Sequence, residues 1–169
     1  MERVYIFVDG SNLYKAVRQM FGAGRLDLEK LARFLTKTRK LVRVHYYSSP
    51  FPRQRDAEIA KNQQRFYEAV RRMPGFKLLL GRLEDHDGTL VEKGVDVRIA
   101  VDMLRMAHGN AYDTAILVSS DGDFVGAVEA IQELGKQVEV AYFHKAWALS
   151  QAADRALALN YNTLKGLMR

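Results

Sequence analysis

Cysteine is absent from this chain of 169 residues, which excludes disulfide bonds, catalytic thiolates, zinc ribbons and iron–sulfur clusters together. Long apolar runs are also missing: the longest, such as Val4–Val8 and Ala115–Val118, are far too short to span a membrane. Only three prolines occur, and no stretch rich in proline, glycine or serine divides the sequence. We therefore expect a single domain, residues 1–169, that does not enter a membrane.

Several catalytic signatures are missing as well. The sequence has no GxxxxGK(S/T) phosphate loop and no GxSxG nucleophile elbow, which argues against ATP-driven chemistry and serine-hydrolase chemistry. The histidines show no HxxxH or similar ligand spacing, so surface or packing roles fit them better than metal binding; they are His45, His86, His108 and His144.

What remains is an ordinary globular composition with a basic surplus. Hydrophobic residues make up 48% and charged residues 27% of the chain. Lysine and arginine number 26 against 20 acidic residues, and the net charge of +6 is compatible with a polyanionic partner without identifying one. Met1-Glu2-Arg3 leads directly into a strand-like segment with no signal-peptide core, so we expect a cytoplasmic protein.

Strand-length apolar runs alternate with segments of helical period. The expected strands are Arg3–Val8, Leu41–Tyr47, Phe76–Leu80, Thr114–Val118 and Gln137–Phe143. The expected helices are Ser11–Phe21, Leu28–Lys37, Arg55–Met73, Val95–His108, Phe124–Leu134 and a segment near Ala146–Ala158. Because the strands lack polar alternation, the βαβα order predicts an α/β fold with a parallel sheet and helices on both faces. Within Leu83–Val91, Asp87-Gly88 predicts a tight turn or hairpin.

Three aspartates follow expected strands. Asp9 ends the first strand in the run VDGSN, and Asp121 and Asp123 follow the strand TAILV in the run VSSDGDF. In an open parallel sheet the ligand crevice lies beyond the carboxyl ends of the strands, and neighbouring strands are about 4.8 Å apart, so such acids can share one ion. Helix capping is an equally good interpretation of Asp9 or of Asp121 taken alone.

Two further aspartates lie in the expected helix Val95–His108. On a helical wheel Asp96 points to the apolar side, where a buried carboxylate needs a cation or hydrogen bonds. Its place in the first turn, where an acid is favourable in any helix, is the alternative explanation. Asp102 shares the solvent-facing wedge of the wheel with Arg98 and Arg105, so we expect it to form surface ion pairs.

Four carboxylates would then share one crevice: Asp9, Asp96, Asp121 and Asp123. Such a cluster repels itself unless a cation is bound, and ligation by oxygen alone favours Mg²⁺ or Mn²⁺ over zinc. Without a catalytic serine, cysteine or histidine set, the chemistry that fits is hydrolysis of a phosphodiester bond by water activated at the metal. Asn12, one helical turn after the first acid, either orients a carboxylate, a water or a phosphate, or caps the helix.

Three segments resemble the NYN domain family in order and spacing, with its LabA-like branch (DUF88) as the nearest match. They are VDGSNLY at Val8–Tyr14, KGVDVRIAVDML at Lys93–Leu104 and LVSSDGDFVGAVEAIQELGKQVEV at Leu117–Val140. That family is similar to PIN-domain nucleases, so the resemblance implies a Rossmann-like, PIN-like single domain and, as in several members, metal-dependent ribonuclease activity. Gly126-Ala127 departs from the Pro-Leu that family members often carry after DGDFV.

The resemblance also implies roles for individual residues. The family's metal-site acids fall on Asp9, Asp96, Asp121 and Asp123. Asn12 matches the polar residue after the first acid, and Lys93 aligns with a basic residue often found before GVD, where it would meet a phosphate. Asp102 matches another recurrent acid of the family, which competes with its interpretation as a surface ion pair.

The expected helix Arg55–Met73 and the loop before it are a candidate surface for a nucleic acid. Its candidate phosphate contacts are Arg53, Arg55, Lys61 and Arg65. Glu58 and Glu68 share the polar face of this helix, which favours an ordinary solvated helix held by ion pairs between successive turns. Aromatic residues within Tyr46–Pro52 are placed to stack exposed bases of single-stranded RNA, although packing at the rim of the sheet is their commoner role.

The leading hypothesis is a Mg²⁺- or Mn²⁺-dependent ribonuclease acting on RNA that is single-stranded or structured with exposed bases, as a monomer or a homo-oligomer. The alternative is an NYN-fold RNA-binding or regulatory module with weak or no catalytic activity. Turnover separates these two hypotheses, whereas metal binding does not. A phosphatase of the haloacid dehalogenase type fits poorly, because Ser11 stands where that chemistry needs a second acid after Asp9.

Overall fold

Six parallel strands form the central sheet of the computed structural model, which describes residues 1–169. The strands are β1 (Arg3–Asp9), β2 (Lys40–Ser48), β3 (Phe76–Leu80), β6 (Thr114–Val118), β7 (Gln137–Tyr142) and β8 (Arg155–Ala158). Their order across the sheet is β3-β2-β1-β6-β7-β8, so the chain moves outward in one direction from β1 and in the other from β6. Ligands of open α/β sheets bind beyond the carboxyl ends of the strands where the order reverses, which here is between β1 and β6.

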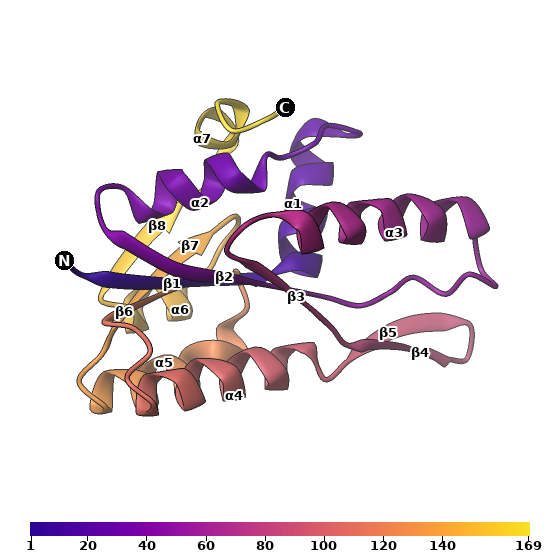
Figure 1. Ribbon diagram of the computed structural model, residues 1–169. Coiled ribbons are helices and arrows are strands. Elements are labelled where there is room, and N and C mark those ends of the chain that lie inside the picture. The colour runs from indigo at the N-terminus through magenta and orange to yellow at the C-terminus, as the bar shows by residue number, and fades with distance from the viewer.

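Helices cover both faces of this sheet (Figure 1). They are α1 (Gly10–Phe21), α2 (Leu28–Thr36), α3 (Ala57–Arg72), α4 (Val95–His108), α5 (Val125–Glu133), α6 (Trp147–Ala152) and α7 (Tyr161–Lys165), with a 3₁₀ turn η1 (Gly122–Phe124) before α5. The helices α1, α2, α3 and α7 pack on one face, and α4, α5 and α6 pack on the other. The expected α/β fold is therefore confirmed. None of these helices combines the length and the apolar character that a membrane span requires.

The two faces of the sheet are visible in the alternation of side chains along β1. Val4, Ile6 and Val8 enter the core beneath α1 and α2, whereas Tyr5 and Phe7 enter the core beside α4 and α5. All five side chains are buried. This explains the continuous apolar run in the sequence, because each face of the strand needs an apolar partner layer.

A separate antiparallel hairpin, β4 (Arg82–His86) and β5 (Thr89–Lys93), extends from the carboxyl edge of the sheet (Figure 1). Its turn residues, Asp87 with φ 52° and Gly88 with φ 85°, both have left-handed backbone. A two-residue type I′ turn needs this conformation at both positions, which is why Asp-Gly is favoured there. The turn expected at Asp87-Gly88 is confirmed.

The segment near Ala146–Ala158 was expected to be one helix, and this prediction is wrong. Only Trp147–Ala152 is helical, and Arg155–Ala158 is the edge strand β8, which pairs in parallel with β7. Asp154 stands between them, and its Oδ2 accepts a hydrogen bond from the backbone N–H of Val138 at 2.8 Å. Pairing with the preceding strand β7, a contact that lies outside the segment itself, therefore overrides the helix preference of an alanine-rich segment. The short helix α7 that follows was not predicted.

Candidate functional site

Three carboxylates meet at the carboxyl edge of the sheet, where the strand order reverses. Asp9 ends β1, Glu92 lies on β5, and Asp96 lies in the first turn of α4. One carboxylate oxygen from each residue lies within 4.8 Å of one oxygen from each of the other two. Asp9 is buried, Glu92 is half-buried and Asp96 is exposed, so the group extends from the sheet to the solvent. We call these three residues the acid cluster.

Asp9 is fixed by hydrogen bonds to both of its carboxylate oxygens. Oδ1 accepts from the backbone N–H of Asn12 at 3.3 Å, and Oδ2 accepts from the Ser119 hydroxyl at 3.0 Å. The capping interpretation is therefore correct for Asp9, which caps α1. Because the same carboxylate also faces the acid cluster, capping does not exclude a role in the site.

Close backbone packing holds the turn from β1 into α1 in place. A Cβ atom on Gly10 would lie 2.3 Å from the carbonyl oxygen of Tyr47 and 2.5 Å from the ring of Tyr46. Only glycine fits at such a distance, which explains the DG pair in the run VDGSN. The end of β2 therefore fixes the direction in which the chain leaves Asp9.

Glu92 is the member of the acid cluster that the sequence analysis missed. Its Oε2 accepts a hydrogen bond from the Ser11 hydroxyl, two residues beyond Asp9. The hairpin brings it there: Glu92 pairs with Leu83 across β4 and β5, and successive residues of a strand point to opposite faces. The expected turn at Asp87-Gly88 was the one available signal, because it implies that this acid returns to the sheet edge.

Asp121 and Asp123 lie beside Asp96 at the rim of the acid cluster, outside the group formed by Asp9, Glu92 and Asp96. Oδ1 of Asp121 accepts a hydrogen bond from the backbone N–H of Asp123 at 2.9 Å, so Asp121 caps η1 as its capping interpretation expected. Both charges nevertheless reach Asp96 and raise its pKa. The structure therefore brings the predicted aspartates to one edge, with Asp9 and Asp96 in direct proximity and the other two beside them.

The acid cluster carries negative charge that no basic side chain neutralises. Burial raises the pKa of Asp9 to about 6, although hydrogen bonds from Asn12 and Ser119 act in the opposite direction. Desolvation, followed by the charges of Asp121 and Glu92, raises the pKa of Asp96 to about 6. No lysine, arginine or histidine forms a salt bridge with the three cluster residues. Mutual repulsion of this kind favours the uptake of a cation.

Asn12 joins the start of α1 to the loop after β6. Its side-chain Oδ1 accepts a hydrogen bond from the backbone N–H of Ser120 at 3.1 Å, while its own backbone N–H donates to Asp9. The neighbouring Ser119 hydroxyl donates to Asp9 and accepts from the backbone N–H of Asp121 at 3.2 Å. Asn12 is therefore not the helix cap, and it holds together the two loops that carry Asp9 and Asp121.

Asp96 and Asp102 have the reverse of the burial expected from the helical wheel. Asp96 is exposed, whereas Asp102 is only 2% exposed. The expected partners of Asp102 are correct: Arg98 Nε and Arg105 Nη2 donate to its carboxylate, each at 3.1 Å. A third donor, the Tyr47 hydroxyl at 2.9 Å, comes from β2. The wheel gives a direction around the helix but no information on which turn lies over the sheet and which lies at its edge.

A chain of buried hydrogen bonds continues from Asp102 into the sheet. The Tyr47 hydroxyl donates its hydrogen to Asp102 and therefore accepts from Nδ1–H of His45, at 3.0 Å. Nε2 of the neutral His45 then accepts from the Tyr5 hydroxyl at 2.7 Å. Burial lowers the pKa of His45 to about 4, in agreement with a neutral ring. His45 is thus a packing residue, as its lack of ligand spacing suggested.

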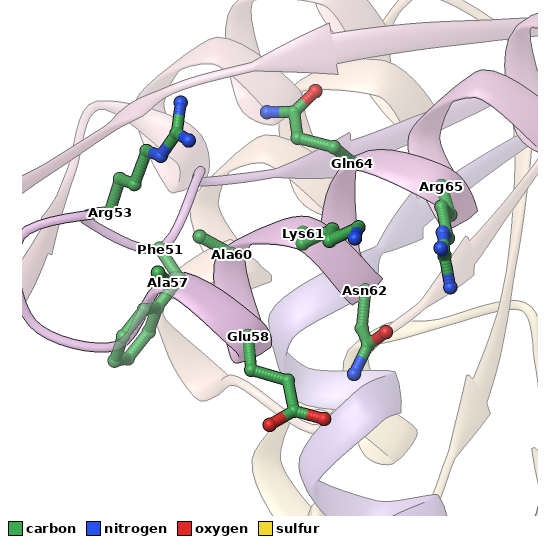
Figure 2. A pocket seen from close by; sticks show the side chains of 9 residues that line it. All are labelled: Phe51, Arg53, Ala57, Glu58, Ala60, Lys61, Asn62, Gln64 and Arg65. Atoms are coloured by element: carbon green, nitrogen blue, oxygen red, sulfur yellow. The ribbon is translucent and has the colours of Figure 1, made fainter.

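The predicted phosphate contacts lie in separate places. Together with Phe51 and Glu58, three of them line a depression of about 810 Å³ along α3 (Figure 2): Arg53, Lys61 and Arg65. Arg55 instead donates to Asp85 at 3.2 Å and to the carbonyl oxygen of Gly88, so it braces the hairpin. Lys93 is exposed at the end of β5.

The aromatic residues expected to stack bases are mostly inaccessible. Tyr46 and Tyr47 are 4% and 1% exposed, and both belong to the core. Phe51 is half-buried and lines the depression along α3. Of this segment, only Phe51 is therefore placed to contact a base.

Comparisons with known proteins agree with this fold. The model of the NYN domain matches residues 3–160 of the chain. The crystal structure of a protein of unknown function, VPA0982 from Vibrio parahaemolyticus RIMD 2210633, is similar with a TM-score of 0.74 and 28% sequence identity. That similarity covers 94% of this chain and 93% of the Vibrio chain. A comparison with curated proteins gave no match.

Proposed function

The chain belongs to the NYN domain family, whose fold is that of PIN-like nucleases, and on this premise we propose that it is a Mg²⁺- or Mn²⁺-dependent ribonuclease. In this proposal water hydrolyses a phosphodiester bond of RNA at the acid cluster. The observation that carries it is the convergence of Asp9, Glu92 and Asp96 from separate elements at the reversal of strand order. The three segments that resemble the LabA-like branch support a place in that branch.

The donor set of the acid cluster fits a hard divalent cation. All three side chains offer carboxylate oxygens, and one from each lies within 4.8 Å of the others. Mg²⁺ and Mn²⁺ prefer such oxygen ligands, and a bound cation would offset both the burial and the mutual repulsion that raise the pKa of Asp9 and of Asp96. Asp9, Glu92 and Asp96 would hold the cation, with Asp121 and Asp123 contributing from the rim.

Asp9 and Asp96 have different roles in the proposed site because their side chains are held differently. A divalent cation, when bound, lowers the pKa of a water molecule and offsets the charge of a phosphate. Asp9 is rigid because Asn12 and Ser119 fix both of its oxygens, so it sets the position of the site. Asp96 is exposed, so a substrate can reach it from solvent. With pKa values of about 6, Asp9 and Asp96 are mostly ionised at pH 7, the form that binds cations.

The proposed substrate is RNA that is single-stranded or has exposed bases. The family supports a nucleic acid, and the net charge of +6 is compatible with a polyanion. Phe51 lies beside the basic side chains of the depression along α3, which offers stacking and charge together. The proposed phosphate contacts are Arg53, Lys61, Arg65 and Lys93, joined by Arg55 if its hairpin contact is released.

The test is cleavage of an end-labelled single-stranded RNA in Mn²⁺, in Mg²⁺ and in EDTA. The variant is Asp96→Asn, and the matched control is Glu129→Gln, which removes an exposed carboxylate of α5. We expect cleavage by the wild type and the control with either ion, and none in EDTA or by Asp96→Asn. RNA binding without cleavage by the wild type, repeated with structured RNA, would support the alternative of a catalytically inactive RNA-binding module.

A further inference from the structure

The base of the hairpin carries positive charges that oppose each other. Arg82 on β4 and Lys93 on β5 are direct partners in the antiparallel register. Residues that are directly opposite in such a pair point to the same face, and like charges there are destabilising. The one acidic contact of Arg82 is with Glu84 at 3.9 Å, and the Arg82 side chain is 79% exposed.

A third cation, Arg98 of α4, joins this pair around a pocket. The pocket has a volume of about 300 Å³ and is lined by Tyr47, Leu79, Leu80, Gly81, Arg82, Lys93, Gly94, Val95 and Arg98. Arg98 is positioned by its bond to Asp102, which uses Nε and leaves the two terminal nitrogens available as donors. We call Arg82, Lys93, Arg98 and the space between them the cationic pocket.

The acid cluster and the cationic pocket lie on the two faces of the same short segment. Glu92 and Lys93 are consecutive on β5, so their side chains point to opposite faces of the hairpin. Gly94 then turns the chain into α4 with φ 82°, and no side chain caps the amide groups of the first turn. Those free amide groups add hydrogen-bond donors next to the pocket, since a helix N-terminus favours anions.

We propose that the cationic pocket binds a phosphate group of the same RNA strand that is cleaved at the acid cluster. This inference rests on the proposed function and extends it to the position of a second phosphate along the strand. An anion between Arg82, Lys93 and Arg98 removes their mutual repulsion, as a cation does at the acid cluster. The phosphate belongs either to an internal phosphodiester or to a phosphorylated 5′ end, because both present the same charged oxygens.

The experiment measures RNA binding by fluorescence anisotropy in EDTA, where no cleavage occurs, over a series of salt concentrations. The variant combines Arg82→Gln with Lys93→Gln. The control combines Arg33→Gln with Lys40→Gln, which removes two exposed charges from α2 and from the start of β2, far from the carboxyl edge. Two RNA oligonucleotides of one sequence are compared, with a 5′-hydroxyl and with a 5′-phosphate.

We expect the pocket variant to bind RNA about tenfold more weakly and its salt dependence to decrease by about one unit of slope. In the control variant, the changes in RNA affinity and in salt dependence should both be smaller than in the pocket variant. A loss with both oligonucleotides identifies an internal phosphodiester as the ligand, and a loss confined to the phosphorylated one identifies the 5′ end. Because Arg82 and Lys93 repel each other, the variant should unfold at the same temperature as the wild type or higher.

Equal affinity and equal salt dependence of the pocket variant and the control would overturn this inference, as would a wild type that binds neither oligonucleotide. Failure of the proposed function is distinguishable from this result. If the pocket variant loses affinity while the wild type never cleaves RNA, phosphate binding by the cationic pocket is supported and the ribonuclease proposal is wrong. If the wild type cleaves RNA and the pocket variant binds RNA like the control, the ribonuclease proposal is supported and phosphate binding by the cationic pocket is wrong.

Discussion

Asp96 and Asp102 lie on the same helix, yet their carboxylates have opposite surroundings. Asp102 is buried among two arginines and a tyrosine, all of which donate hydrogen bonds to it. Asp96 lies at the exposed end of α4 beside other acids, and no side chain donates a salt bridge to it. The protein thus provides Asp102 with cationic partners of its own and provides none for Asp96, as the proposed metal site requires.

The comparison separates an anchoring role from a binding role within α4. The bonds around Asp102 connect the helix to β2 through Tyr47, and onward through His45 to Tyr5 of β1. The same chain of contacts therefore joins α4, whose first turn carries Asp96, to β1, the strand that ends in Asp9. We infer that the contacts of Asp102 determine stability, whereas the acid cluster determines the metal binding and cleavage of the proposed function.

The largest effect that we expect is the loss of activity in Asp9→Asn, which tests the binding role against the anchoring role of Asp102. Asparagine has the shape of aspartate: its Oδ1 still accepts from the backbone N–H of Asn12, and its Nδ2 donates to the Ser119 hydroxyl, which in the wild type donates to Oδ2, so the fold should be kept. We expect metal-dependent cleavage to fall by at least about 100-fold, more than the loss of an outer-shell partner causes. In EDTA the thermal midpoint should equal or exceed that of the wild type, because a desolvated carboxylate has been removed. Cleavage rates and thermal unfolding, measured on the same preparation, test the expected loss of activity and the expected thermal midpoint.

The same substitution at Asp102 should have the opposite outcome. Asp102→Asn weakens the bonds from Arg98 and Arg105, whose side chains are 53% and 66% exposed and regain water. We expect a loss of about 2 kcal/mol in the free energy of unfolding, or about 4–8 °C in the thermal midpoint. Below that midpoint the variant should retain metal-dependent cleavage. A variant with wild-type stability and no cleavage would instead place Asp102 in the site, as its family resemblance alone suggested.

A smaller effect is expected from pH, and its sign follows from the raised pKa values. Asp9 and Asp96 have pKa values of about 6 in the folded protein, above their ordinary value of 3.8. Between these values the folded state holds more protons than the unfolded state, so these two groups make the metal-free protein less stable as the pH rises. Protons also compete with the cation for both carboxylates, and each group is about ten times more ionised at pH 7 than at pH 5, so Mn²⁺ should bind at least about tenfold more tightly at pH 7.

Thermal unfolding at pH 5, 6 and 7, with and without Mn²⁺, measures both pH effects. The informative quantity is the difference between the wild type and Asp9→Asn, because acids with lowered pKa values, such as Asp113, contribute to both proteins equally. The difference should shrink toward pH 5. A difference that is independent of pH would mean that Asp9 titrates like an ordinary surface carboxylate.

Much of the fold was predictable because its signals are local. The apolar run of β1 and the Asp87-Gly88 turn each reflect conformations that a few adjacent residues determine. The strand β8 was not predictable in the same way, because its partner β7 lies elsewhere in the chain and the local sequence favours a helix. The positions of Asp9, Asp121 and Asp123 at the sheet edge followed from strand ends alone.

The site was less predictable than the fold, since its composition depends on contacts between distant segments. Glu92 joins Asp9 only because the hairpin folds back to the sheet, and no motif marks it. The helical wheel placed Asp102 in solvent because it contains no information about Tyr47, which reaches α4 from β2. Asp96 was expected among apolar residues for the same reason: the wheel does not show that the first turn of α4 lies at the edge of the sheet.

Glu92 offers the most direct test of the account, because its role comes from the structure and from no motif. The measurement is the Mn²⁺ concentration that gives half-maximal RNA cleavage by the wild type, by Glu92→Gln and by the control Glu129→Gln. If the acid cluster holds the cation, this concentration rises by at least about tenfold in Glu92→Gln and is unchanged in Glu129→Gln. The same half-maximal concentration in all three proteins would contradict the assignment of the acid cluster as the metal site.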